Sequence, residues 1–206
     1  MINILLDELP TEWNGYRLDT DFQIGIQLIL IQEDVEMSKS EKCSAMAGLL
    51  FCDELPSMQE MQECITWYLT GWNHDKQPKS RDHRKVMDFD IDQWRIYSAF
   101  LRQYRIDLND LGYEPVYDEA GSPVLDQHGN QIMAERHLHF WTFMGLLANL
   151  EESNYSRVIE ARQKKPGPKA SREERKRISE AHEVFDLDQT TSYEDQEFKE
   201  HIDELL

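Results

Sequence analysis

Residues 88–104, DFDIDQWRIYSAFLRQY, decide the fold class of this protein. Apolar and aromatic side chains recur in this stretch at spacings of three and four residues, as they do along one face of an α-helix. Asp90 precedes them and can cap the start of the helix with its carboxylate. We therefore expect a central helix whose wide apolar face is buried and consists of Ile91, Trp94, Ile96, Tyr97, Phe100, Leu101 and Tyr104.

Further helices are indicated on both sides of this stretch. Residues 22–30 alternate as a strand would, but they also form a helical face, and the capping side chains of Asp19–Asp21 favour a helix. The other predicted helices are 40–52, a segment after Pro56-Ser57 through Trp72, 134–150, a segment capped by Ser153 or Asn154, and one that starts near Ser171. The Met and aromatic residues spaced along these helices are interpreted as core.

Two segments predict small β-structures. Asn14-Gly15 tolerates the positive φ values of a tight turn, so we expect a hairpin within residues 2–18. PVYDEAGS at 115–122 and PVLDQHGN at 123–130 repeat the pattern PVxDxxGx with a period of eight, which predicts a three-strand meander inserted at about 114–133. The predicted fold is mainly α: a helical domain with an N-terminal β-hairpin, a small inserted β-meander and a C-terminal helical arm.

Charge is distributed unevenly along the 206 residues, whose formal net charge is -18. Residues 157–177 carry nine Lys/Arg against three Glu, whereas 178–206 carry one Lys against ten Asp/Glu. We interpret 1–156 as a helical body and 157–206 as a basic hinge followed by an acidic helical arm. The apolar residues of the acidic arm form a narrow stripe of the kind that needs a partner surface.

We therefore predict that the partner-binding residues lie in this C-terminal part. The predicted contacts in the acidic arm are Phe198, Ile202, Leu205 and Leu206. The predicted contacts in the basic segment are Lys164, Lys165, Lys169, Arg172, Arg175, Lys176 and Arg177. If residues 157–206 are removed, we expect the body to remain folded and assembly with partners to fail.

Enzymatic activity is not expected. The nucleophile, phosphate-loop, dinucleotide and zinc-protease signatures are all absent, and three cysteines match no common metal or disulfide pattern. His74, Asp75, Asp82 and His83 lie in a polar loop, and His137 and His139 are only two residues apart. No catalytic, cofactor-binding or metal-ligating residue is predicted. The longest apolar run, Leu28–Ile31, is too short to cross a membrane.

Nucleic-acid binding is the alternative function. A polyanion is repelled by most of so acidic a surface, so only a local patch could bind it. Lys164–Ser171, KKPGPKAS, loosely resembles the Pro-Gly basic segments that lie in A·T-rich minor grooves, and a basic helix follows it. A DNA-associated regulator that uses residues 164–177 is therefore the second hypothesis.

Several segments together resemble a known family. They are LLDELP at 5–10, LDTDF at 18–22, residues 88–110 (DFDIDQWRIYSAFLRQYRIDLND), residues 139–162 (HFWTFMGLLANLEESNYSRVIEAR) and the ERKR helix that ends in VFDLD. Their content and order are similar to the bacteriophage tail assembly chaperones of long-tailed phages that infect Gram-positive bacteria. The meander looks like an insertion into that pattern.

The resemblance implies a nonenzymatic role in virion assembly. Such a protein binds the tape-measure protein, keeps it in solution and recruits the major tail protein before the tail tube polymerises. It implies action as a homo-oligomer in the host cytoplasm and absence from the mature virion. A strongly acidic surface is compatible with keeping an apolar client soluble.

Overall fold

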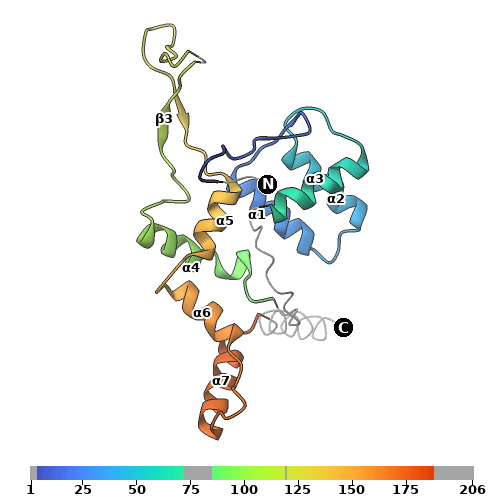
Figure 1. Ribbon diagram of the computed structural model, residues 1–206, viewed down its shortest axis with the longest axis vertical. Coiled ribbons are helices and arrows are strands. Elements are labelled where there is room, and N and C mark those ends of the chain that lie inside the picture. The colour runs from blue at the N-terminus through green and yellow to red at the C-terminus, as the bar shows by residue number, and fades with distance from the viewer. Residues whose placement is uncertain (1–3, 72–84, 119, 188–206) are drawn as a thin grey trace, which may run out of the picture. The chain divides into compact units, whose positions relative to one another are not determined.

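The computed structural model describes residues 4–71, 85–118 and 120–187 (Figure 1). The described residues form seven helices and two small antiparallel sheets, which confirms the predicted mainly α class with minor β-elements. The chain forms two compact units, one from residues 1–76 and 106–149 and the other from 77–105 and 150–206. None of the described helices is long and apolar enough to cross a membrane.

The first unit begins with the predicted hairpin. Strands β1 (Glu12–Trp13) and β2 (Tyr16–Arg17) pair antiparallel, with Trp13 opposite Tyr16. Asn14 and Gly15 between them have φ values of 49° and 84°, the left-handed conformation that a two-residue turn of this kind requires. The Asn-Gly prediction is confirmed.

Three helices follow, each begun by a side chain that accepts backbone hydrogen bonds. They are α1 (Phe22–Glu33), α2 (Lys39–Leu50) and α3 (Met58–Thr70). Asp21 caps α1, as predicted from the capping side chains of Asp19–Asp21. Residues 22–30 are helical rather than extended. The other two helices start with reciprocal capping boxes, Ser38 with Glu41 and Ser57 with Glu60. In each box, the serine hydroxyl and backbone amide lower the pKa of the glutamate.

Helix α5 (Phe140–Ala148) packs against α1 at a point where α1 has no side chain. A Cβ on Gly25 would lie 2.0 Å from the ring of Phe140, so this close approach requires glycine. The Phe140 ring stacks on Tyr68 of α3 at 5.3 Å, and Trp141 donates its indole N–H to the Tyr68 carbonyl at 2.7 Å. These contacts hold α1, α3 and α5 around one aromatic core.

Helix α5 begins six residues later than the predicted start at residue 134. Residues 133–135 form strand β4 instead, because their backbone pairs with β3 (Tyr113–Pro115). The buried His139 is the cap: its Nδ1 accepts from the Trp141 amide, and its Nε2 lies 3.0 Å from the Pro10 carbonyl, which accepts from it. Burial lowers the pKa of His139, which matches a neutral ring with one donor and one acceptor.

His137 and His139, which were considered as metal ligands, both lie within hydrogen-bond distance of protein groups. His139 uses both ring nitrogens within the fold, and the Nε2 atom of His137 lies 3.4 Å from the Thr20 hydroxyl. The other residues considered, His74, Asp75, Asp82 and His83, lie outside the described residues.

The predicted meander forms an arm between β3 and β4 that extends away from α5 (Figure 1). Its three segments close into a ring of backbone hydrogen bonds. Val116 donates to Ile132, Ile132 donates to Val124, and Val124 donates to Val116, at 2.8–2.9 Å. Because these residues are eight positions apart, the third member of the ring continues the period of the two repeats.

The two turns of the arm have the same construction. The Asp118 carboxylate accepts from the amides of Ala120 and Ser122, and the Asp126 carboxylate accepts from those of His128 and Asn130. Gly121 and Gly129 close the turns with φ values of 76° and 83°. The Asp-x-x-Gly part of each repeat is therefore the turn, as predicted, and the preceding Pro-Val pair enters the ring.

The second unit contains α4 (Phe89–Gln103), α6 (Asn154–Gln163) and α7 (Arg172–Phe185). Within this unit, α6 packs on both α4 and α7. Ser153 caps α6 and Ser171 caps α7, in agreement with the predicted starts. Helix α4 is capped by Asp88, not by Asp90 as predicted, because the Asp88 carboxylate accepts from the amides of Asp90 and Ile91.

The buried face of α4 also differs from the prediction. Ile91, Trp94 and Leu101 were expected inside but are exposed, and Trp94 is 73% exposed. The buried residues of the helix are Phe89, Asp92, Ile96, Ala99 and Phe100. Both sides of α4 carry apolar residues at helical spacing, so periodicity alone could not choose between them. The inner side is the one that carries Asp92.

Two glycines provide a matched test of the packing between α1 and α5. Gly25→Ala should destabilise the first unit by about 1–3 kcal/mol or more, because the added methyl overlaps the Phe140 ring. Gly48→Ala adds the same methyl inside α2, where nothing lies within 4 Å, and should stabilise by about 0.5–1 kcal/mol. Chemical unfolding of both variants measures this, and equal effects would contradict the close packing.

Candidate partner-binding surface

Helices α6 and α7 form a hairpin that presents the predicted basic segment. Helix α6 ends before Pro166, a short turn follows in which the Ala170 amide donates to the Gly167 carbonyl, and Ser171 starts α7. The two helices are tied near the loop, where the His182 Nε2 lies 2.9 Å from the Lys164 carbonyl. The hairpin buries Val158 and Ile178, so its inner face is apolar.

A cleft of about 570 Å³ opens between these two helices. Its floor includes Ala161, Ile178 and Ala181. Its charged lining is balanced, with three basic and three acidic residues: Arg157, Lys164, Arg177, Glu160, Glu173 and Glu174. The cleft therefore has no charge preference for an anionic or a cationic ligand.

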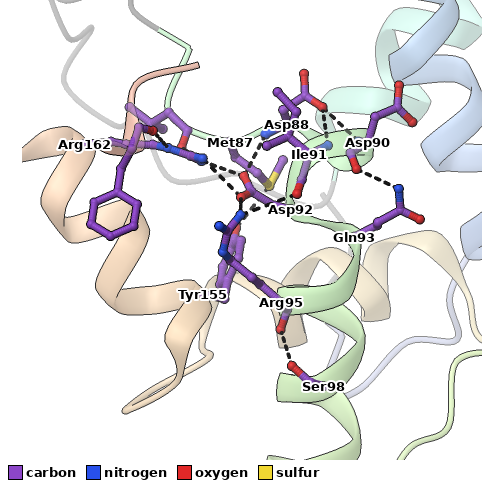
Figure 2. A network of polar contacts seen from close by, with 12 residues as sticks. Met87, Asp88, Asp90, Ile91, Asp92, Gln93, Arg95, Ser98, Tyr155 and Arg162 are labelled. Atoms are coloured by element: carbon purple, nitrogen blue, oxygen red, sulfur yellow. Dashed lines mark hydrogen bonds and ion pairs between the residues drawn. The ribbon is translucent and has the colours of Figure 1, made fainter. Parts of the chain in front are cut away.

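The buried ion pair of Asp92 and Arg162 joins α4 to α6 (Figure 2). The guanidinium engages both carboxylate oxygens, at 2.6 Å from Nη1 to Oδ2 and 3.2 Å from Nη2 to Oδ1. Asp92 is fully buried and Arg162 is almost so. The carboxylate also accepts from Arg95 Nη1 at 2.8 Å and from the Asp88 amide at 3.2 Å, so both oxygens are hydrogen-bonded.

Arg162 also binds two backbone carbonyls. Its Nη1 donates to the Val86 carbonyl at 3.0 Å, and its Nε donates to the Phe185 carbonyl at 2.6 Å. One planar guanidinium thus connects the segment before α4, the inner face of α4 and the last residue of α7. A lysine could not make these contacts, because its single ammonium lacks the planar, forked set of donors.

A residue of α6 also contacts the segment just before α4 (Figure 2). The Tyr155 hydroxyl of α6 donates to the Met87 sulfur at 3.0 Å. Burial raises the pKa of Tyr155 to about 12. Burial opposes the charge of Asp88, but the Lys85 ammonium at 2.5 Å and the amides of α4 lower the pKa of this carboxyl overall.

All seven basic residues predicted to bind partners are exposed. Lys164, Lys165 and Lys169 lie in or at the start of the loop, and the other four lie on α7. Arg175 donates to the carbonyls of Ala170 and Pro168, and Lys176 lies 3.5 Å from Glu180. Phe198, Ile202, Leu205 and Leu206 lie outside the described residues.

The basic character of the segment is weaker than its sequence count of nine Lys/Arg against three Glu. Arg162 belongs to that count, but it is buried and neutralised by Asp92. Helix α7 itself carries four Lys/Arg and four Glu. A concentrated basic surface therefore remains only around the loop, at Lys164, Lys165 and Lys169.

The outer face of α4 and the Asp92–Arg162 pair were both missed in the sequence. A signal for the pair was present, because Asp92 is three residues after Phe89 and four before Ile96, on their common helical face. An acidic residue on a buried face requires a cationic partner. The sequence did not indicate which arginine supplies it.

Asp92→Asn tests how strongly the pair stabilises the second unit. The substitution keeps the shape but leaves the Arg162 guanidinium buried without a counter-charge, so we expect a loss of about 3–5 kcal/mol. Arg95→Gln is the matched control, because Arg95 binds the same carboxylate from a partly exposed position and should cost about 0–1 kcal/mol. Native-state hydrogen exchange of α4 and α6 measures both, and equal costs would contradict the assignment.

Comparison with known families identifies the chain. The family model of the bacteriophage Gp15 protein matches residues 5–114 and 122–187. The match omits 115–121, within the first PVxDxxGx copy, and ends at the last described residue before the acidic end. No curated protein and no solved structure gave a match. Because the model covers most of the sequence, the chain belongs to the bacteriophage Gp15 protein family.

Proposed function

We propose that this phage protein is a nonenzymatic tail assembly chaperone, which binds the tape-measure protein and recruits the major tail protein in the host cytoplasm. The observation that carries the proposal is the family match over residues 5–114 and 122–187. It includes both segments on which the resemblance to tail assembly chaperones is strongest, 88–110 and 140–162. Asp92 and Arg162 lie in these two segments.

The distribution of apolar side chains supports this role. A chaperone for an apolar, helical client needs exposed apolar surface, which a soluble protein otherwise keeps small. Trp94 on α4 and Val184 on α7 are 73% and 72% exposed. The net charge of -18 would keep a complex with such a client in solution. We propose that the protein acts as a homo-oligomer and leaves before the virion is complete.

The alternative of a DNA-associated regulator has less support. Its proposed helix, α7, carries as many glutamates as basic residues. Phosphate binding depends on a cluster of unpaired Lys/Arg, and here Lys176 lies near Glu180 while Arg175 binds carbonyls of its own loop. If the alternative holds, neutralising Lys164, Lys165, Arg175 and Arg177 should abolish DNA retention and leave chaperone behaviour intact. DNA retention that persists in physiological salt and is lost in this variant would favour the alternative.

Co-expression with the neighbouring tail proteins tests the proposal directly. We expect the tape-measure protein to be soluble only in the presence of this chain. Phe198→Asp with Ile202→Asp should weaken binding of the tape-measure protein by about a hundredfold or more, because two apolar contacts worth about 1.5–3 kcal/mol each are lost. The variant should keep the stability of the first unit within about 0.5 kcal/mol, because both substitutions belong to the second unit.

The matched control adds the same charge nearby. Thr191→Asp with Ser192→Asp makes the acidic end equally more negative without removing an apolar residue. This control should recover the tape-measure protein at the wild-type yield. Wild-type yield with the Phe198/Ile202 variant as well would exclude the acidic end from client binding.

A further inference from the structure

The outer face of α4 carries an apolar stripe. Ile91, Trp94 and Leu101, here called the Trp94 stripe, are three and seven residues apart and follow one side of the helix opposite the buried Ile96 and Phe100. Their exposed fractions are 38%, 73% and 42%. Exposed apolar side chains that include a tryptophan are typical of a docking surface.

Charges of both signs lie beside this stripe: Asp90 is next to Ile91 and four residues before Trp94, and two arginines follow one edge. Within residues 93–106 the charged residues are Arg95, Arg102 and Arg105. Arg95 and Arg102 are two helical turns apart and flank the Trp94 stripe on the same edge. The Arg95 guanidinium binds Asp92 on its inner side, and Arg102 lines a hollow with Glu151 and Glu152. An occupant with acidic residues beside its apolar face would complement this edge.

The last described residues before the acidic end lie next to the Asp92 side of α4, which is opposite the Trp94 stripe. The Phe185 carbonyl, at the end of α7, accepts from the Arg162 guanidinium, which also holds Asp92 in the first turns of α4. Leu187, two residues later, is buried. Nineteen residues, 188–206, follow Leu187 in the sequence.

Residues 188–206 match the stripe in pattern, charge and length. Phe198, Ile202 and Leu205 have the i, i+4, i+7 spacing of one helical face, among seven Asp/Glu and one Lys. As a helix, residues 198–205 would span about 10 Å, against about 15 Å for residues 91–101. The preceding ten residues can extend to about 33 Å, more than the roughly 22 Å length of α4.

We propose that residues 196–206 dock on the Trp94 stripe of the same chain. Phe198, Ile202 and Leu205 would cover Ile91, Trp94 and Leu101, with acidic side chains beside Arg95 and Arg102. The cleft between α6 and α7 is the competing location within this unit. The charges of its lining balance, and its apolar lining consists of two alanines and the buried Ile178, so it offers no large exposed apolar side chain and no charge selection.

Docking would regulate access to the client contacts. Phe198 and Ile202 are also the predicted contacts with the tape-measure protein, so the free chain would hide them until a client competes for them. This consequence rests on the proposed function, whereas the docking itself does not. Measurements on the full chain without any client therefore probe the docking alone.

Hydrogen exchange of the full-length chain, followed by mass spectrometry, tests the docking. Amides in 196–206 should exchange more slowly in the wild type than in Trp94→Ala, by about tenfold or more, because the variant removes the largest apolar contact. Arg102→Glu should produce a smaller loss of protection than Trp94→Ala. In the wild type, high salt should lower the protection of residues 196–206, because it screens the attraction between charges. Val184→Ala is the control, since Val184 is equally exposed on α7.

Three outcomes would overturn the proposal. Residues 196–206 could exchange at the unprotected rate in the wild type, or Trp94→Ala could leave their protection unchanged. Protection that disappears on about fiftyfold dilution would assign the docked segment to a second copy of the chain. Loss of protection in Val184→Ala but not in Trp94→Ala would place the contact on α7.

Discussion

The buried ion pair of Asp92 and Arg162 is the interaction on which the second unit depends. Two charges removed from water are tolerated only where every donor and acceptor is satisfied. Here both carboxylate oxygens are hydrogen-bonded, and the guanidinium also binds the carbonyls of Val86 and Phe185. Because one side chain joins α4, α6 and the end of α7, residues distant in sequence form a single unit. The outward face of α4 is a consequence, since burying Asp92 turns Trp94 to the solvent.

Local structure could be predicted wherever its cause lies within a few residues. The Asn14-Gly15 turn, the Asp21 cap and the serine caps of α6 and α7 were identified in the sequence, and the Asp-x-x-Gly repeats correctly located the turns of the arm. The start of α5 was wrong because it depends on pairing between β3 and β4, twenty residues apart. The inner face of α4 was wrong because the partner of Asp92 lies seventy residues away.

The candidate partner-binding surface also combines features that are determined locally with features that depend on distant residues. Exposed lysines at 164, 165 and 169 follow from a Pro-Gly loop, which the sequence displays directly. The neutralisation of Arg162 and the balance of charges on α7 depend on folding, so the basic segment is less basic on the surface than in the sequence. What the fold adds is an exposed apolar face on α4, opposite the Asp92 side. The partner-binding hypothesis thereby gains a second surface, and the DNA hypothesis loses part of its charge.

The coupling free energy between Asp92 and Arg162 tests the central claim most directly. It is obtained from a double-mutant cycle of Asp92→Asn, Arg162→Met and the double variant, with the opening free energy of α4 measured by native-state hydrogen exchange. A coupling of about 2 kcal/mol or more, with the double variant less destabilised than the sum of the single variants, is the predicted result. Additive effects within about 0.5 kcal/mol would contradict the account, because they would mean that the two charges stabilise the unit independently.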